Sequence, residues 1–168
     1  MNALHPGTDE STLADRLAGI IGYLRMQRYG DVSHALKDAL HGACDKFVRR
    51  LADHLRHEEE VLFPGLLEAS PGSAAMLEEI RQEHRLLHIY ARELGVRLRA
   101  RDEDGAFAVA RSFLGALFDH IQREGDAVDS IVRSLDEAAA RKILDLMLAT
   151  SGACPECRKR GLGCGCGP

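Results

Sequence analysis

The chain has 168 residues, 45% of them hydrophobic and 29% charged, and a formal net charge of -4 at pH 7. This length suits one compact domain with a short tail, and this composition excludes intrinsic disorder because it supplies enough apolar surface for a core. The mild acidity argues against binding of nucleic acid or of a membrane surface through bulk charge, which needs a clustered basic excess.

Neither a membrane span nor a secretory signal is predicted. No apolar run approaches the roughly 18 residues that cross a bilayer, and the first residues, MNALHPGTDEST, lack a basic and then apolar pattern. We therefore expect a cytoplasmic protein. In a reducing compartment, the cysteine cluster near the C-terminal end favours a metal or redox element over structural disulfides.

Helical periodicity extends through the chain to about residue 150, and no strand pattern competes with it. The first helix is predicted over residues 12–30 and opens with a capping box from Thr12 to Asp15. The second is predicted over residues 33–67 and stops before a Ser-Pro-Gly-Ser break.

Two further long helices follow, and a short one closes the series. Their apolar residues recur over residues 76–98 and 110–131, with a charged turn over residues 99–105 between them. A capping box from Ser134 to Glu137 is expected to start the short fifth helix.

Long amphipathic helices joined by short loops bury their apolar faces best as an antiparallel up-down four-helix bundle. We predict an all-α fold with this bundle and the short fifth helix over residues 1–150. Residues 151–168 form a separate Cys/Gly-rich tail, whose composition does not build a packed core.

Polar pairs interrupt the apolar stripe of three helices, and the two members of each pair are four residues apart. Such a pair lies on one helix face, with Cβ atoms within about 6 Å of each other. Buried carboxylates and imidazoles are costly unless paired, and a metal ion is the strongest available partner. The alternative is that these are core histidines hydrogen-bonded to Glu or to the backbone. This alternative would explain a single pair, but it explains three pairs at matching positions less well. The predicted metal ligands are His54, Glu58, His84, His88, His120 and Glu124.

Imidazole and carboxylate donors without thiolate suit iron, manganese or zinc, and six ligands exceed the four of a structural zinc site. Iron is therefore the first choice. The Glu-x-x-His motif of ferritin-like carboxylate sites does not occur in the chain.

Three segments resemble the hemerythrin-like (HHE cation-binding) domain: His54-Leu-Arg-His-Glu58-Glu-Glu-Val-Leu-Phe-Pro64, Glu83-His84-Arg-Leu-Leu-His88 and His120-Ile-Gln-Arg-Glu124. The resemblance covers residues 12–148. It implies a four-helix bundle with a non-haem di-iron centre that binds O2, NO or peroxide as a carrier, sensor or scavenger. It further implies bridging by Glu58 and Glu124, one iron completed by His84, His88 and His120, and a second iron served by His54.

The first helix departs from that family's pattern. The family supplies a histidine there for the second iron, whereas residues 11–30 contain none and show Asp15-Arg16 where an Asp-His pair would fall. Asp15, Tyr23 and His5 are the substitute donors, and the sequence does not choose among them. We expect the second iron to bind more weakly or to use an oxygen donor.

Other polar residues of the second helix are expected outside the site. His57, Glu59 and Glu60 belong to a solvated, charged flank, while His34 and His41 turn away from the ligands. Two alternative functions stay open: a di-iron oxidoreductase that consumes peroxide or nitric oxide, and an iron-responsive protein that recruits a partner through its tail.

The tail carries a second candidate metal or redox site. Four thiolates can close a tetrahedron, so a small zinc knuckle is the first interpretation, with an iron–sulfur site, a redox-active dithiol and a flexible tail as alternatives. A separate cysteine, Cys44, lies on the apolar stripe and is predicted to be a buried small hydrophobe. The four tail thiols are Cys154, Cys157, Cys164 and Cys166.

Overall fold

The computed structural model describes the backbone of residues 8–29 and 34–150, and the side chains of residues 12–26 and 35–147. The secondary structure of this part of the chain is all helical, as predicted, with short turns between the helices and no strand. Its elements are α1 (Thr8–Tyr29), α2 (His34–His57), the π-helical turn η1 (Glu58–Leu62), α3 (Phe63–Ala69), the 3-10 turn η2 (Pro71–Ser73), α4 (Ala74–Arg99), α5 (Glu103–Ser134) and α6 (Glu137–Thr150).

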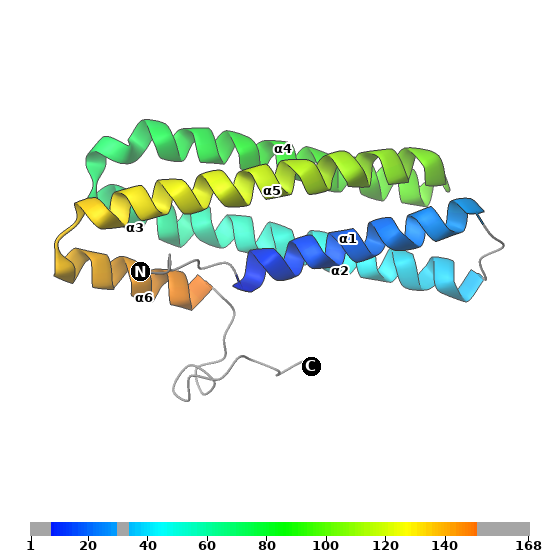
Figure 1. Ribbon diagram of the computed structural model, residues 1–168, viewed down its shortest axis with the longest axis horizontal. Helices are drawn as coiled ribbons and strands as arrows, with labels where there is room; N and C mark the ends of the chain where they lie inside the picture. Colours follow the sequence, from blue (N-terminus) through cyan, green and yellow to red (C-terminus); the bar gives the residue numbers. More distant parts are fainter. Residues whose placement is uncertain (1–7, 30–33, 151–168) are drawn as a thin grey trace, which may run out of the picture.

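The long helices lie along a common axis and form a helical bundle (Figure 1). α4 packs against α5, and α1 packs against both α5 and α2. The short α6 contacts η1 and α3 and covers one end of the bundle. The predicted tail, residues 151–168, lies outside the described residues.

The core consists of two apolar clusters separated by a polar layer. The larger cluster joins α1, α2, α4 and α5, and the smaller one joins η1, α3, α4, α5 and α6. On each helix that passes through both clusters, the apolar stripe is interrupted by buried Glu or His residues. In chain order, the residues that flank these interruptions are Leu55 and Leu62, Ile80 and Leu87, and Leu117 and Val128.

Cys44 lies in the larger cluster with 1% of its surface exposed, which confirms its predicted role as a small core residue. Burial, supported by the negative charge of Asp45 and opposed by Arg99, raises the pKa of Cys44 to about 11. The thiol is therefore neutral at physiological pH and packs as an apolar group.

Two of the predicted helix starts are wrong: α1 begins earlier in the chain, and a different residue caps α6. α1 begins at Thr8, so the expected capping box at Thr12 lies inside the helix. The Ser134 hydroxyl donates to the Ile131 carbonyl over 2.7 Å at the end of α5. Asp136 caps α6 instead, because its carboxylate accepts the Ala139 N–H over 2.8 Å.

A tight turn joins α4 to α5 at the end of the bundle away from α6. Arg101 N–H donates to the Leu98 carbonyl and Asp102 N–H to the Arg97 carbonyl, both over 3.0 Å, which is the Schellman arrangement. This arrangement places Arg101 at a positive φ of 56°. Asp102 then caps α5 by accepting the Gly105 N–H over 2.9 Å.

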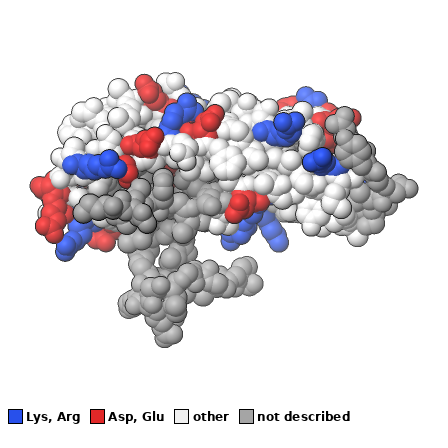
Figure 2. All heavy atoms as spheres, viewed as in Figure 1, with Lys and Arg blue, Asp and Glu red and all other residues white. Residues whose placement is uncertain are grey.

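Basic and acidic side chains are interspersed on the face of the molecule shown in Figure 2. Among the described residues, pairs of opposite charge include Arg97 with Asp102 and Arg133 with Asp129. The described residues on this face therefore present no large patch of one sign. None of the helices that the structure describes combines the length and the apolarity needed to cross a bilayer.

Candidate metal centre

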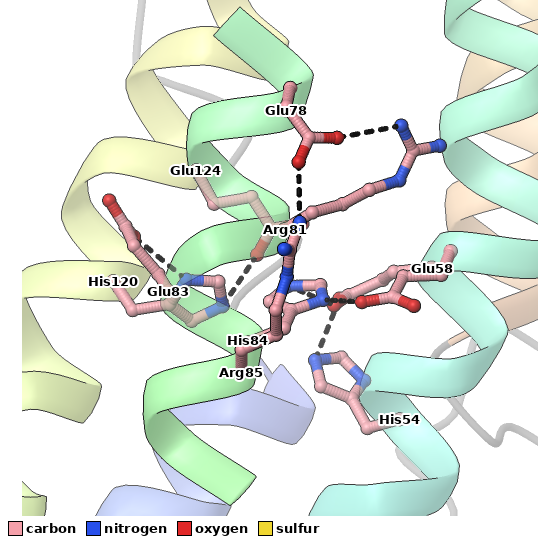
Figure 3. A network of polar contacts seen from close by, with 10 residues as sticks. His54, Glu58, Glu78, Arg81, Glu83, His84, Arg85, His120 and Glu124 are labelled. Atoms are coloured by element: carbon pink, nitrogen blue, oxygen red, sulfur yellow. Dashed lines mark hydrogen bonds and ion pairs between the residues drawn. The ribbon is translucent and has the colours of Figure 1, made fainter. Parts of the chain in front are cut away.

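Five of the six predicted ligands meet in the polar layer between the two core clusters (Figure 3). Glu58 begins η1, His84 lies on α4, and His120 and Glu124 lie on α5; no more than 6% of any of these residues is exposed. His54 on α2 has a side chain that is 9% exposed. Donors from three helices therefore face one buried region.

The Glu58 carboxylate lies between two imidazoles. Its Oε1 is 2.8 Å from His54 Nε2, and its Oε2 is 3.5 Å from His84 Nε2. The two oxygens of one carboxylate thus face histidines from α2 and from α4. A carboxylate in this position can donate one oxygen to each of two neighbouring cations.

His120 and Glu124 form the α5 side of the site. His120 Nε2 lies 3.5 Å from Glu124 Oε2. The rings of His120 and His84 meet edge to face, with centroids 4.9 Å apart. The Nε2 of His84 thus faces Glu58, and the Nε2 of the neighbouring His120 ring faces Glu124.

These residues fit a metal ion. Glu58, His84 and His120 each offer a ligand atom within 4.8 Å of the others. Two neighbouring ligands with bonds of about 2.0–2.2 Å to one ion lie about 3.0–3.4 Å apart. The nitrogen–oxygen separations of 3.5 Å are close to that spacing and longer than a good hydrogen bond. An ion would also compensate for the burial of the two carboxylates.

The helix that carries His54 and Glu58 changes its winding at the site. In η1, the Phe63 N–H donates to the Glu58 carbonyl, five residues back. Pro64 explains this turn because proline has no N–H and its ring clashes with the carbonyl four residues earlier in an α-helix. The expected uninterrupted helix over residues 33–67 is therefore wrong at this point. π-Turns of this kind are common at functional sites.

Phe63, at the end of the π-turn, forms one wall of the site. Its ring stacks on that of His84 with centroids 5.4 Å apart and an interplanar angle of 26°. The Arg81 guanidinium lies 5.4 Å from the Phe63 ring centroid. The phenyl ring keeps the His84 imidazole in a low-dielectric environment, where its interactions with carboxylates are stronger than in water.

The family model of the hemerythrin HHE cation-binding domain matches residues 13–128. The chain belongs to this family. The match confirms the resemblance drawn from the three motifs, and its range includes every residue of the buried cluster. Searches of the curated proteins and of the solved structures gave no significant match.

In this HHE domain, His88 does not join the cluster. It is exposed on α4, whereas Leu87 and Ala91 continue the buried stripe after His84. Successive residues of an α-helix are 100° apart, so the residue after Leu87 turns outward. The structure corrects the expected inward position of His88.

The first helix of this HHE domain presents no buried polar donor among its described side chains. The buried residues of α1 are all apolar, whereas Asp15 is exposed and Tyr23 is 46% exposed. The predicted substitute donors Asp15 and Tyr23 therefore do not face the core. His5 lies outside the described residues. The buried residues of α1 are Leu13, Ala14, Leu17, Ile20 and Leu24.

The other predicted positions agree with the structure only in part. His41 lies near the opposite end of the bundle, beside Lys37 and Leu98, as expected for a residue outside the site. His57 is half-buried rather than solvated and is not part of the metal-binding group. The His34 side chain and the four tail cysteines lie outside the described residues.

Two glutamates behind the cluster were not predicted to take part. His84 Nδ1 lies 2.8 Å from Glu59 Oε1, and His120 Nδ1 lies 3.1 Å from Glu83 Oε2. Glu59 was expected to be solvated, and Glu83, which begins the second motif segment, was given no role. The only signal in the sequence is that each glutamate adjoins a ligand residue, Glu59 after Glu58 and Glu83 before His84.

Proposed function

We propose that this HHE domain holds a non-haem di-iron centre and binds O2, NO or peroxide as a carrier, sensor or scavenger. The observation that carries the proposal is the position of Glu58, whose two oxygens face His54 and His84. Membership of a cation-binding family and the buried Glu58–His84–His120 group support a metal at this place. Bound iron supplies redox chemistry and a coordination position for a small ligand.

Iron is favoured by the donor set. The cluster offers imidazoles and carboxylates without thiolate, which suits iron, manganese and zinc. Three histidines and two glutamates exceed the four ligands of a structural zinc site, and they can be shared between two ions. The role of the chain is to present these donors in a space from which most water is excluded.

The two ions are expected to differ in affinity. His84 and His120 face Glu58 and Glu124 and form the richer set of donors. His54 and the other oxygen of Glu58 form the poorer set, because the described core-facing residues of α1 are all apolar. The second ion is therefore held more weakly by protein atoms and is the better position for an exogenous ligand.

An anaerobic iron(II) titration, followed by metal analysis, tests the proposal. We expect two binding steps of unequal affinity, and an optical change when O2, NO or peroxide is added to the loaded protein. His120→Ala should abolish the tighter step, whereas the exposed control Gln122→Ala should leave both steps unchanged. A loaded protein that gives no optical change with any of the three molecules would contradict the proposed function.

The same preparation distinguishes binding from catalysis. A reversible optical change without consumption of the added molecule supports a carrier or sensor. Steady-state consumption of peroxide or NO by the wild type, absent in His120→Ala, would instead support the alternative di-iron oxidoreductase.

A further inference from the structure

The two ligand histidines on α4 and α5 each contact a glutamate on the side of the ring away from the metal-binding carboxylates. Glu59 of η1 reaches His84 on α4, and Glu83 of α4 reaches His120 on α5. Both contacts are made to Nδ1, on the opposite edge of the ring from the Nε2 that faces the metal-binding carboxylates.

These contacts determine where the imidazole proton resides. A neutral imidazole has one N–H donor and one bare nitrogen, and an ionised carboxylate only accepts hydrogen bonds. A glutamate at Nδ1 therefore favours the tautomer with the proton on Nδ1. The lone pair then resides on Nε2, the atom that faces Glu58 in His84 and Glu124 in His120.

The other tautomer would oppose metal binding. With the proton on Nε2, the ring would donate toward the Glu58 or Glu124 carboxylate, and the proton would occupy the direction in which an ion must bind. The inner carboxylates favour that arrangement, since they too accept hydrogen bonds. The outer glutamates counteract this preference.

We propose that Glu59 and Glu83 are positioning residues that hold His84 and His120 in the tautomer with a bare Nε2. This inference rests on the proposed function, because it concerns the same metal centre. The two residues act through the imidazoles and do not themselves join the cluster of ligand atoms. Their effect is on metal affinity and on the state of the histidines before metal arrives.

The surroundings of the two glutamates predict that Glu83 has the larger effect. Its side chain is 17% exposed, and its second oxygen forms an ion pair with Arg123, whose Nε lies 2.8 Å from it. The Glu59 side chain is 40% exposed, so water competes more strongly for its carboxylate. Arg123 lies one turn after His120 on α5, so it holds Glu83 against the ring that Glu83 orients.

The backbone explains why a ligand and a positioning residue can be neighbours. Glu58 and Glu59 are consecutive, as are Glu83 and His84. Successive side chains of a helix point in different directions, about 100° apart in the α-helical α4, so when one points into the core, the next points toward an adjacent helix. This geometry lets one short segment serve two helices.

The first test measures the tautomer without metal. In 15N NMR spectra of the metal-free wild type, His120 should show a protonated Nδ1 and a bare Nε2. Glu83→Ala should shift the proton toward Nε2, and Glu83→Gln, which keeps an acceptor oxygen without the charge, should fall between them. An unchanged His120 tautomer in Glu83→Ala would overturn the inference.

The second test measures iron(II) affinity. Glu83→Ala should weaken binding by about 10–100-fold, and Glu59→Ala by less. Glu79→Ala, at an exposed position one turn earlier on α4, should bind as tightly as the wild type. Should Glu83→Ala fail to fold by circular dichroism, Glu83→Gln gives the comparison, with a smaller loss of affinity expected. Equal affinity in the folded Glu83 variant and the wild type would overturn the inference.

The two proposals fail separately. If the wild type binds no iron(II), the proposed function fails, while the NMR comparison still tests the tautomer. If the wild type binds iron(II) and the Glu83 variants match it in both measurements, only the positioning role fails.

Discussion

His84 and His88 offer a matched test of the site, since both are histidines of α4 and lie one turn apart. His84 is fully buried, with Nε2 3.5 Å from the Glu58 carboxylate, whereas His88 is exposed. We predict that His84→Ala loses the stabilisation that iron(II) gives to the fold and that His88→Ala keeps it. The comparison is made on the shift in melting temperature, so a change in the metal-free stability of either variant does not affect it.

The expected size follows from binding linkage. An ion present at 100 times its Kd stabilises the folded state by about 2.7 kcal/mol. For a chain of this length, each kcal/mol raises Tm by about 2–4 °C, which gives a wild-type shift of about 5–11 °C. Residues behind a ligand typically change affinity by about 10–100-fold, and loss of a ligand should do no less. A 100-fold loss leaves about 0.4 kcal/mol at the same concentration.

Thermal unfolding followed by circular dichroism, with and without iron(II) under anaerobic conditions, measures these shifts. His88→Ala should match the wild type, and His84→Ala should show a shift of no more than about 1–2 °C. A full shift in His84→Ala, or an equal loss in both variants, would refute the placement of the ligands.

Three further predictions concern stability away from the site. Arg101→Gly should stabilise the fold by about 0.5–1 kcal/mol in urea unfolding, because glycine adopts the positive φ of this position without strain. The control Arg99→Gly, inside the last turn of α4, should destabilise the fold. A loss of stability in both variants would contradict the turn geometry. The hydrogen bond from Arg97, and then that from the Gly105 N–H, lowers the pKa of Asp102, so its contribution to stability is present at neutral pH and is lost as pH falls through the folded-state pKa. The wild type should therefore lose its advantage over Asp102→Asn in acid, and a pH-independent difference would argue against this pair. The raised pKa of Cys44 gives the opposite pH dependence. The contribution of the neutral thiol to stability is complete below pH 9.0 and is lost as pH rises to about 11. The difference in unfolding free energy between the wild type and Cys44→Ala should therefore change over that interval.

The helices could be predicted from the sequence because apolar residues recur every three or four positions. Leu40, Cys44, Phe47 and Leu51 are all buried as that spacing requires. The ends were harder to predict, since several Ser, Thr and Asp residues near each end can cap a helix and the tertiary structure selects one. At the start of α6, for example, Asp136 rather than Ser134 is the cap.

The grouping of these polar residues in the core was predicted largely, but not completely, from the paired spacing. His54 with Glu58 and His120 with Glu124 face the same buried layer. On a helix, positions three and four residues after His84 are both near its face, and the packing of α4 buries Leu87 rather than His88. That choice depends on the neighbouring helices, which the spacing of one helix does not specify.

The outer glutamates and the π-turn required the structure. Glu59 and Glu83 act on histidines 25 and 37 residues away in sequence, so their role depends on which helices lie side by side. Pro64 does give a local signal, because proline disrupts an α-helix. It indicates a break, and the structure shows that the chain responds with a π-turn that keeps Glu58 at the site.

The most direct test of the central claim is the metal content and optical spectrum of protein expressed in iron-rich medium. The account predicts about two irons for each chain, with a charge-transfer band typical of an oxo-bridged pair. Zinc alone at one ion for each chain, without iron, would contradict the di-iron proposal and point to the cysteine tail instead.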